Sequence, residues 1–77
     1  MKLNARERTI AARNRLLFED GRARVKTGSG KTAIIEPNYM NINRQYFSAY
    51  TIDDELNHKM ICTRATLETA LRKIAES

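Results

Sequence analysis

The sequence predicts an α+β domain in which a small antiparallel sheet of two hairpins is flanked by an N-terminal and a C-terminal helix, in the order α-β-β-β-β-α. Apolar residues recur at helical spacing near both ends of the chain. The segments between them alternate in polarity or are rich in aromatic and β-branched residues, and turn signals separate these segments. A chain of 77 residues is the length of one small domain, so residues 1–77 are predicted to fold as a single unit.

The first element is predicted to be a helix over about residues 5–20. Asn4 can cap its N-terminus, and Gly21 can end it. The apolar stripe expected to face the core consists of Leu3, Ile10, Ala11, Leu17 and Phe18. Arginines border this stripe on both edges, namely Arg6 and Arg13 on one and Arg8 and Arg15 on the other. These arginines either pack their aliphatic carbons along the edge of the core, with the guanidinium groups in solvent, or form an exposed basic face.

Strict alternation follows over residues 22–27, which predicts a strand with Arg22, Arg24 and Lys26 on one face. The glycines of residues 28–30 indicate a hairpin turn. The basic side chains should therefore form one row along the first strand of a hairpin.

The return strand of this hairpin is predicted over residues 31–36. Pro37 should end it, because proline disrupts a paired strand. Residues 38–43 are polar and are expected to form a loop.

A second hairpin is predicted from a strand over residues 45–52, an acidic turn over 53–57 and a return strand over 58–62. On the longer strand, one face carries Tyr46, Ser48, Tyr50 and Ile52. The opposite face carries Phe47, Ala49 and Thr51.

The last element is predicted to be a helix capped by Thr63. Its i, i+3, i+4, i+7 stripe consists of Leu67, Ala70, Leu71 and Ile74. This spacing predicts one buried face.

Positive charge is concentrated in the first part of the chain. The formal net charge is +5, but residues 1–31 hold nine Lys or Arg against three Asp or Glu, which is a local charge of +6. The other residues hold five basic and six acidic side chains, which is −1. A positive charge confined to one part of the chain suggests a polyanionic partner or an acidic protein surface. A basic helix that is merely exposed to solvent would give the same distribution of charge along the sequence.

The predicted binding surface combines the basic side chains of the first helix and the first hairpin. Its members are Arg6, Arg8, Arg13, Arg15, Arg22, Arg24, Lys26 and Lys31. Alternate residues of a strand are about 6.6 Å apart, close to the nucleotide spacing of an extended single strand. Tyr46 and Tyr50 could stack on bases if their strand face is exposed, or could be core residues if it is not.

Two motifs that suggest chemistry are better explained by structure. Residues 28–32, Gly-Ser-Gly-Lys-Thr, match half of a phosphate-binding loop but lead into a predicted strand rather than a helix. His58 and Cys62 are about 13 Å apart in a strand, too far for a catalytic dyad, and one His and one Cys fall short of a zinc site. We therefore expect no catalytic residue, no metal and no cofactor.

Residues 46–71 resemble, in arrangement, the strand–turn–strand–helix of integrase arm-binding DNA modules, which read DNA with a three-stranded sheet backed by a helix. The usual Trp and Gly residues of such modules are missing here. The same arrangement resembles small bacteriophage proteins that block host or defence machinery. The resemblance implies a binding protein of one of these two kinds.

Together these observations predict a non-catalytic protein that binds nucleic acid, either DNA or RNA, or a nucleoprotein complex, with an affinity that falls steeply with salt. The alternative is a protein–protein inhibitor or adaptor of the phage-encoded anti-defence (anti-CRISPR-like) or host-takeover type, which would grip an acidic surface. No membrane partner is expected, because no apolar run approaches about 20 residues. The single cysteine favours a reducing compartment, hence the cytoplasm. A homodimer is left open.

Overall fold

The computed structural model describes residues 3–41 and 44–77, with the backbone course only for 39–41 and 44–45. Its elements are α1 (Ala5–Arg13), β1 (Ala23–Lys26), β2 (Thr32–Asn41), β3 (Arg44–Ile52), β4 (His58–Arg64) and α2 (Leu67–Ala75). The predicted order α-β-β-β-β-α is confirmed.

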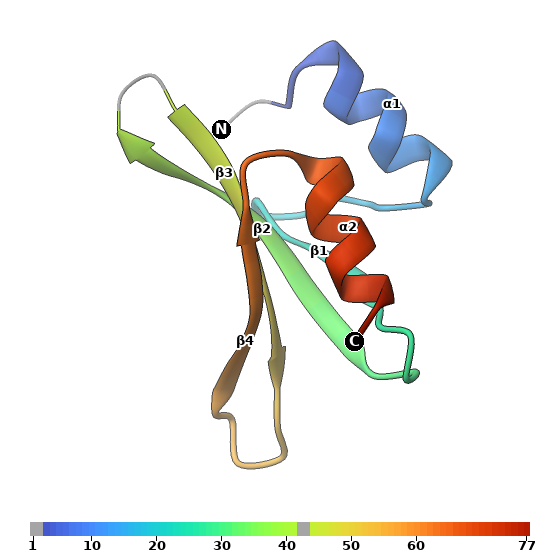
Figure 1. The fold of residues 1–77 in the computed structure, drawn as a ribbon, viewed down its shortest axis with the longest axis vertical. Coiled ribbons are helices and arrows are strands. Elements are labelled where there is room, and N and C mark those ends of the chain that lie inside the picture. The colour runs from blue at the N-terminus through green and yellow to red at the C-terminus, as the bar shows by residue number, and fades with distance from the viewer. Residues whose placement is uncertain (1–2, 42–43) are drawn as a thin grey trace.

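The four strands form one antiparallel sheet in the order β1-β2-β3-β4. Figure 1 shows both helices on the same side of this sheet, so that one sheet face is covered and the other is not. The molecule therefore has two layers, and the residues that alternate along each strand divide between the core and the uncovered face.

The core lies between the sheet and α2. Its largest fully buried side chains are Ile35 and Phe47 from the sheet and Leu67 and Ile74 from α2. The stripe predicted for the C-terminal helix is confirmed, since Ala70 is also buried and Leu71 packs against the cluster. Burying such aliphatic and aromatic side chains stabilises the fold by about 1.5–3 kcal/mol each.

Helix α1 ends at Arg13, earlier than the predicted end at residue 20. The amide of Leu16 donates to the carbonyl of Ala11 at 2.8 Å. Arg15 lies between them with a left-handed backbone, at φ 56°. This is the Schellman arrangement that usually ends a helix at glycine, here built on an arginine.

The early end of the helix changes which leucine is buried. Leu17, predicted to face the core, is 70% exposed, whereas Leu16 is buried. Helical spacing no longer applies beyond Arg15, because the left-handed residue turns the chain. Ala11 is buried, and Leu3, Ile10 and Phe18 pack against the core, as predicted.

Strand β2 is longer than predicted. The sequence placed the end of this strand at Pro37, but the strand continues to Asn41. Most of the loop predicted for 38–43 is therefore extended strand, and residues 42–43 lie outside the described residues.

Pro37 fits because β2 has only one neighbour at this point. The register between β1 and β2 ends where Ala23 faces Ile35, so beyond it β2 pairs only with β3, and Pro37 faces Phe47. A strand with one open edge tolerates the missing N–H of proline.

The boundary between β4 and α2 also lies later than predicted. Thr63 faces Ser48 within the β3–β4 ladder and caps no helix, and β4 continues to Arg64. The N-cap of α2 is Thr66, whose hydroxyl accepts the amide of Thr69 at 3.2 Å.

The turn of the first hairpin packs against the C-terminal end of α2. The amide of Gly28 donates to the carbonyl of Ile74 at 3.4 Å, and that of Ser29 to the carbonyl of Ser77 at 3.0 Å. The first bond gives the Ile74 carbonyl, in the last turn of α2, a second donor besides the amide of Ser77. The second bond ties the turn to the residue just beyond the helix cap. Lys31 follows the turn and leads directly into β2, so the half-motif of a phosphate-binding loop opens no helix here.

In the described part of the chain, no helix is long and apolar enough to cross a membrane.

Candidate nucleic-acid interface

The basic side chains of β1 lie on the sheet face that the helices leave uncovered. Ala23 and Thr27, on the opposite side of the strand, are buried, while Arg22, Arg24 and Lys26 are exposed. The alternation predicted from the sequence is confirmed at these positions. We call Arg22, Arg24 and Lys26 the β1 basic row.

Neighbouring groups occupy two members of the row. The Arg22 Nε lies 3.7 Å from a Glu36 carboxylate oxygen. The Lys26 Nζ donates to the Thr32 hydroxyl at 3.0 Å. Among the described residues, Arg24 has no ion-pair or hydrogen-bond partner for its side chain, so its guanidinium is free to bind an anion.

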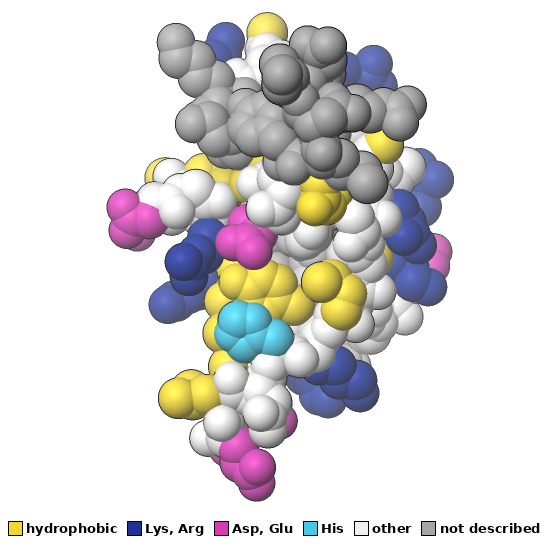
Figure 2. All heavy atoms as spheres, turned by 90° about the vertical axis from the view of Figure 1, so that its left-hand side faces the viewer, with side chains coloured by type: hydrophobic (Ala, Val, Ile, Leu, Met, Phe, Trp, Pro, Cys, Tyr) yellow, Lys and Arg dark blue, Asp and Glu magenta, His cyan; other side chains and the backbone are white. Residues whose placement is uncertain are grey.

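An apolar stripe continues from Arg24 across the uncovered face. In the sheet register Arg24 faces Ile34, Ile34 faces Tyr50, and Tyr50 faces Met60. One side chain from each strand thus forms a line that begins with a cation and ends with a methionine that is 60% exposed. Figure 2 shows hydrophobic side chains in the middle of this face, with basic side chains beside them.

Tyr50 and His58 form an aromatic pair on the same face. Their rings are stacked with centroids 4.7 Å apart and planes 12° from parallel. Tyr50 is only 6% exposed, whereas His58 is exposed. Figure 2 shows the histidine, in cyan, lying on hydrophobic surface with its outer side toward solvent.

The two tyrosines predicted as stacking candidates therefore differ. Tyr50 lies on the uncovered face, yet it is buried, because His58 lies over its ring. Its face is therefore the outer one, but the ring itself is not exposed. Tyr46 is half-buried near the start of β3. Among the side chains that the structure describes, the exposed aromatic ring of this face is that of His58.

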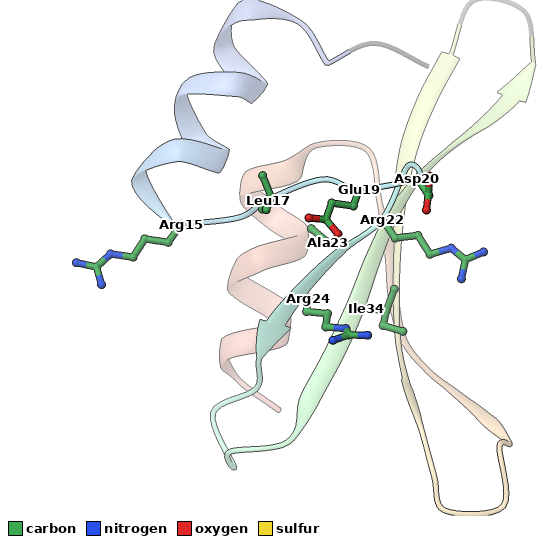
Figure 3. A pocket seen from close by; sticks show the side chains of 8 residues that line it. All are labelled: Arg15, Leu17, Glu19, Asp20, Arg22, Ala23, Arg24 and Ile34. Atoms are coloured by element: carbon green, nitrogen blue, oxygen red, sulfur yellow. The ribbon is translucent and has the colours of Figure 1, made fainter.

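An open hollow of about 520 Å³ lies at the outer edge of β1. It is lined by Arg15, Leu17, Glu19, Asp20, Arg22, Ala23, Arg24 and Ile34. Figure 3 shows Arg15 pointing away from the other side chains, and Arg24 lying beside Ile34. Because arginines and two carboxylates line the hollow together, it is not uniformly positive. It meets the β1 basic row at Arg22 and Arg24 and adds no further cation to that row.

The arginines of α1 do not join the β1 basic row. They belong to the helix layer on the other face of the sheet (Figure 1). Arg6 is bound to Glu68 of α2 at 2.7 Å, and with Arg13 it lines a second, shallow hollow. The Arg8 guanidinium donates to the carbonyl of Leu3 at 3.3 Å. The predicted surface is thus divided in two by the sheet.

Lys31 lies in the hairpin turn at the far end of the β1 basic row. Its amide donates to the Thr27 hydroxyl at 3.0 Å, and its side chain is exposed. Its carbonyl accepts the amide of Thr27, a residue on the covered side of the strand, so its exposure alone does not add it to the β1 basic row.

His58 and Cys62 lie on opposite faces of β4, because the irregularity in the β3–β4 register falls between them. In a regular strand, residues four apart would share a face. Cys62 is buried against α2, its thiol 3.9 Å from the carbonyl of Ala70, and this burial raises the pKa of the thiol. A protonated, buried thiol is a poor nucleophile. In residues 3–41 and 44–77, no group of three His, Cys, Asp or Glu is placed to hold a metal ion.

The acidic turn shapes the end of the second hairpin. The Asp53 carboxylate accepts the amides of Asn57 at 2.8 Å and Glu55 at 2.9 Å. The bond from Asn57 is the largest reason that the pKa of Asp53 lies below its ordinary value. The aspartate thus holds the turn through two hydrogen bonds from the backbone.

Sequence reasoning missed Ile34, His58 and Met60 as parts of this surface. Alternation along β2 places Ile34 beside Arg24, which the sequence could have shown. The position of Met60 depends on an irregularity in the β3–β4 register between Ala49 and Tyr50, which has no local sequence signal.

No protein-family profile matches this chain, and comparisons with curated proteins and with solved structures returned no match.

Proposed function

We propose that this protein binds nucleic acid, alone or within a nucleoprotein complex, through the uncovered face of its sheet, without catalysing a reaction. The β1 basic row contacts phosphates, and the apolar stripe lies beneath the rest of the ligand. The observation that carries the proposal is the position of Arg24, a guanidinium with no partner among the described residues, at the start of a line of apolar side chains. Phosphate contacts of this kind position a ligand without reading its sequence.

The charges of the row support a polyanion over a small anion. Three cations at strand spacing lie about 6.6 Å apart, so they match a ligand whose charges repeat along a line. Arginine suits phosphate because its planar fork donates two parallel hydrogen bonds. As part of the same proposal we place the protein in the cytoplasm, where a lone buried thiol stays reduced.

The test is binding of fluorescent single- and double-stranded DNA and RNA, followed by anisotropy between roughly 50 and 200 mM salt. Three phosphate contacts predict a slope of about −2 for single strands, which is a loss of about 15- to 20-fold over this range. Arg24→Glu should lower the affinity about 10-fold at the lower salt and reduce the slope by about 1.

The matched control is Arg72→Glu, which makes the same charge change on α2 in the helix layer. We expect it to bind within about twofold of the parent chain, since exposed charges beyond a Debye length of about 10 Å are screened. No binding to any strand at low salt, or equal losses in Arg24→Glu and Arg72→Glu, would refute the proposal.

A second candidate function, a protein–protein inhibitor or adaptor, rests on the apolar side chains of the second hairpin. Leu56 is 78% exposed and Ile52 is 40% exposed near the β3–β4 turn. Apolar side chains exposed at the tip of a hairpin are available for burial against a partner protein. This function predicts a partner that stays bound after nuclease treatment and is released by Leu56→Asp.

A further inference from the structure

The stacked pair of Tyr50 and His58 has the geometry of a platform for an unpaired base. Its rings are 4.7 Å apart and 12° from parallel, which is an offset stack with one ring face left over. We propose that a nucleobase stacks on the outer face of His58, so that the preferred ligand is single-stranded nucleic acid. The inference rests on the function proposed above and names its ligand class.

Burial explains why the base would meet His58 and not Tyr50. Tyr50 is 6% exposed, because Ile34 and Met60 lie beside it in the register and His58 covers it. A ring held from behind by another ring keeps its orientation. It therefore loses less conformational freedom on binding than a free side chain would.

The cations are placed to hold the backbone of the same strand. Arg24 is on β1 and the stacking ring, His58, is on β4, so the two residues are three strand spacings apart. This is about 14 Å, because neighbouring strands are about 4.8 Å apart. The arginine side chain and the apolar Ile34 bridge part of this gap. A strand that runs along β1 can thus direct its bases across the sheet toward the histidine.

A base in a duplex cannot use this platform. Its faces are already stacked on neighbouring bases, so only an unpaired base can place a face on His58. The β1 basic row by itself would bind both forms, since phosphates are present in both.

Charge favours single-stranded nucleic acid over two other ligands that could cover an apolar face, namely a second copy of the chain and an acidic peptide. A second copy of the chain carries +5 and brings its own β1 basic row to the surface, which adds like charges. An acidic peptide satisfies the cations but offers no flat ring to His58. Single-stranded nucleic acid supplies both the charges and the rings.

The test compares a short thymidine oligonucleotide with an abasic strand of the same length, which keeps the phosphates and lacks the bases. His58→Ala should weaken binding of the thymidine strand about 5- to 10-fold, the lower part of the range for loss of one base stack, and leave its salt slope unchanged. The same variant should bind the abasic strand as the parent chain does. His58→Phe should restore binding of the thymidine strand.

Each other outcome has a definite meaning. If Arg24→Glu weakens binding but His58→Ala weakens neither strand, or weakens both equally, the stacking inference is wrong and the proposed function stands. If Arg24→Glu weakens binding of neither oligonucleotide, the proposed function itself is wrong, and the stacking inference that rests on it falls too. If sedimentation shows a dimer that His58→Ala dissociates, the face binds a second copy of the chain. If polyglutamate binds as tightly as the oligonucleotide, the face binds an acidic peptide. A thermal melt of each variant shows that the fold is retained.

Discussion

Arg15 shows how one residue can decide where a helix ends. A non-glycine residue in the left-handed region costs about 1–2 kcal/mol, and Arg15 adopts this backbone at φ 56°. The cost is offset because the turn it makes allows Leu16 to pack against the core beside Ala11. The termination of α1 thus depends on a buried contact and not on the residue type at the turn.

This arrangement predicts that Arg15→Gly stabilises the protein. Glycine removes the left-handed strain but loses about 0.5–1 kcal/mol more in backbone entropy, so the net gain should be about 0.5–1 kcal/mol. Arg13→Gly is the control, because Arg13 is the last residue of the helix, where glycine relieves no left-handed strain and should destabilise by a similar amount. Urea unfolding of both variants measures the difference, and a destabilised Arg15→Gly would show that the arginine side chain has a role of its own.

Residue-level reasoning from the sequence identified the basic row but not the ring that is available for stacking. Alternation from Arg22 to Lys26 is a local pattern, and it placed the cations on the correct face. Whether Tyr50 is exposed depends on which residues of β4 lie beside it. That depends on the register between β3 and β4, where the irregularity after Ala49 brings Met60 opposite Tyr50.

At the scale of elements, the strands and the C-terminal helix could be predicted because their signals are local. The ends of β2 and α1 could not. Pro37 stays inside a strand only because β1 has already ended, and this is a fact about a neighbour rather than about the sequence around the proline. The hairpin turns were predicted correctly, since glycine and aspartate determine them within a few residues.

The contact between the first hairpin turn and α2 is the clearest junction of two elements. A Cβ at Gly28 would collide with the carbonyl oxygen of Ala75, which is backbone and cannot move aside cheaply. The junction joins the β1 end of the sheet to the C-terminal helix, so it supports the strand that carries the β1 basic row.

Gly28→Ala should therefore destabilise the protein by about 1–3 kcal/mol through overpacking. It should also speed hydrogen exchange of the Ser29 amide, which donates to Ser77. Gly30→Ala serves as the control: its Cβ meets nothing within 4 Å, and only the strain of φ +86° is expected there. A Gly28→Ala variant with unchanged stability and unchanged Ser29 exchange would show that the turn does not dock on α2 in solution.

At the scale of the whole molecule, the sheet divides the positive charge of the first 31 residues between two sides. The β1 basic row lies on the uncovered face, while Arg6, Arg8 and Arg13 belong to the helix layer. Glu68 neutralises part of the second group through Arg6. A count along the sequence cannot show this division, because it adds charges that face opposite directions.

The division predicts unequal effects from two charge reversals of equal size. Arg22→Glu with Arg24→Glu should lower the affinity for single strands by about 100-fold at roughly 50 mM salt, because two phosphate contacts become repulsive. Arg8→Glu with Arg13→Glu changes the net charge identically but acts across the thickness of the sheet and its core. Its effect should stay within about threefold and should vanish near 150 mM salt, where the Debye length is about 8 Å.

Anisotropy titrations of both double variants provide the measurement, with thermal melts to show that each is folded. Equal losses in the two would mean that the ligand wraps around the sheet edge and contacts both layers. The α1 arginines would then belong to the interface, as the sequence alone suggests.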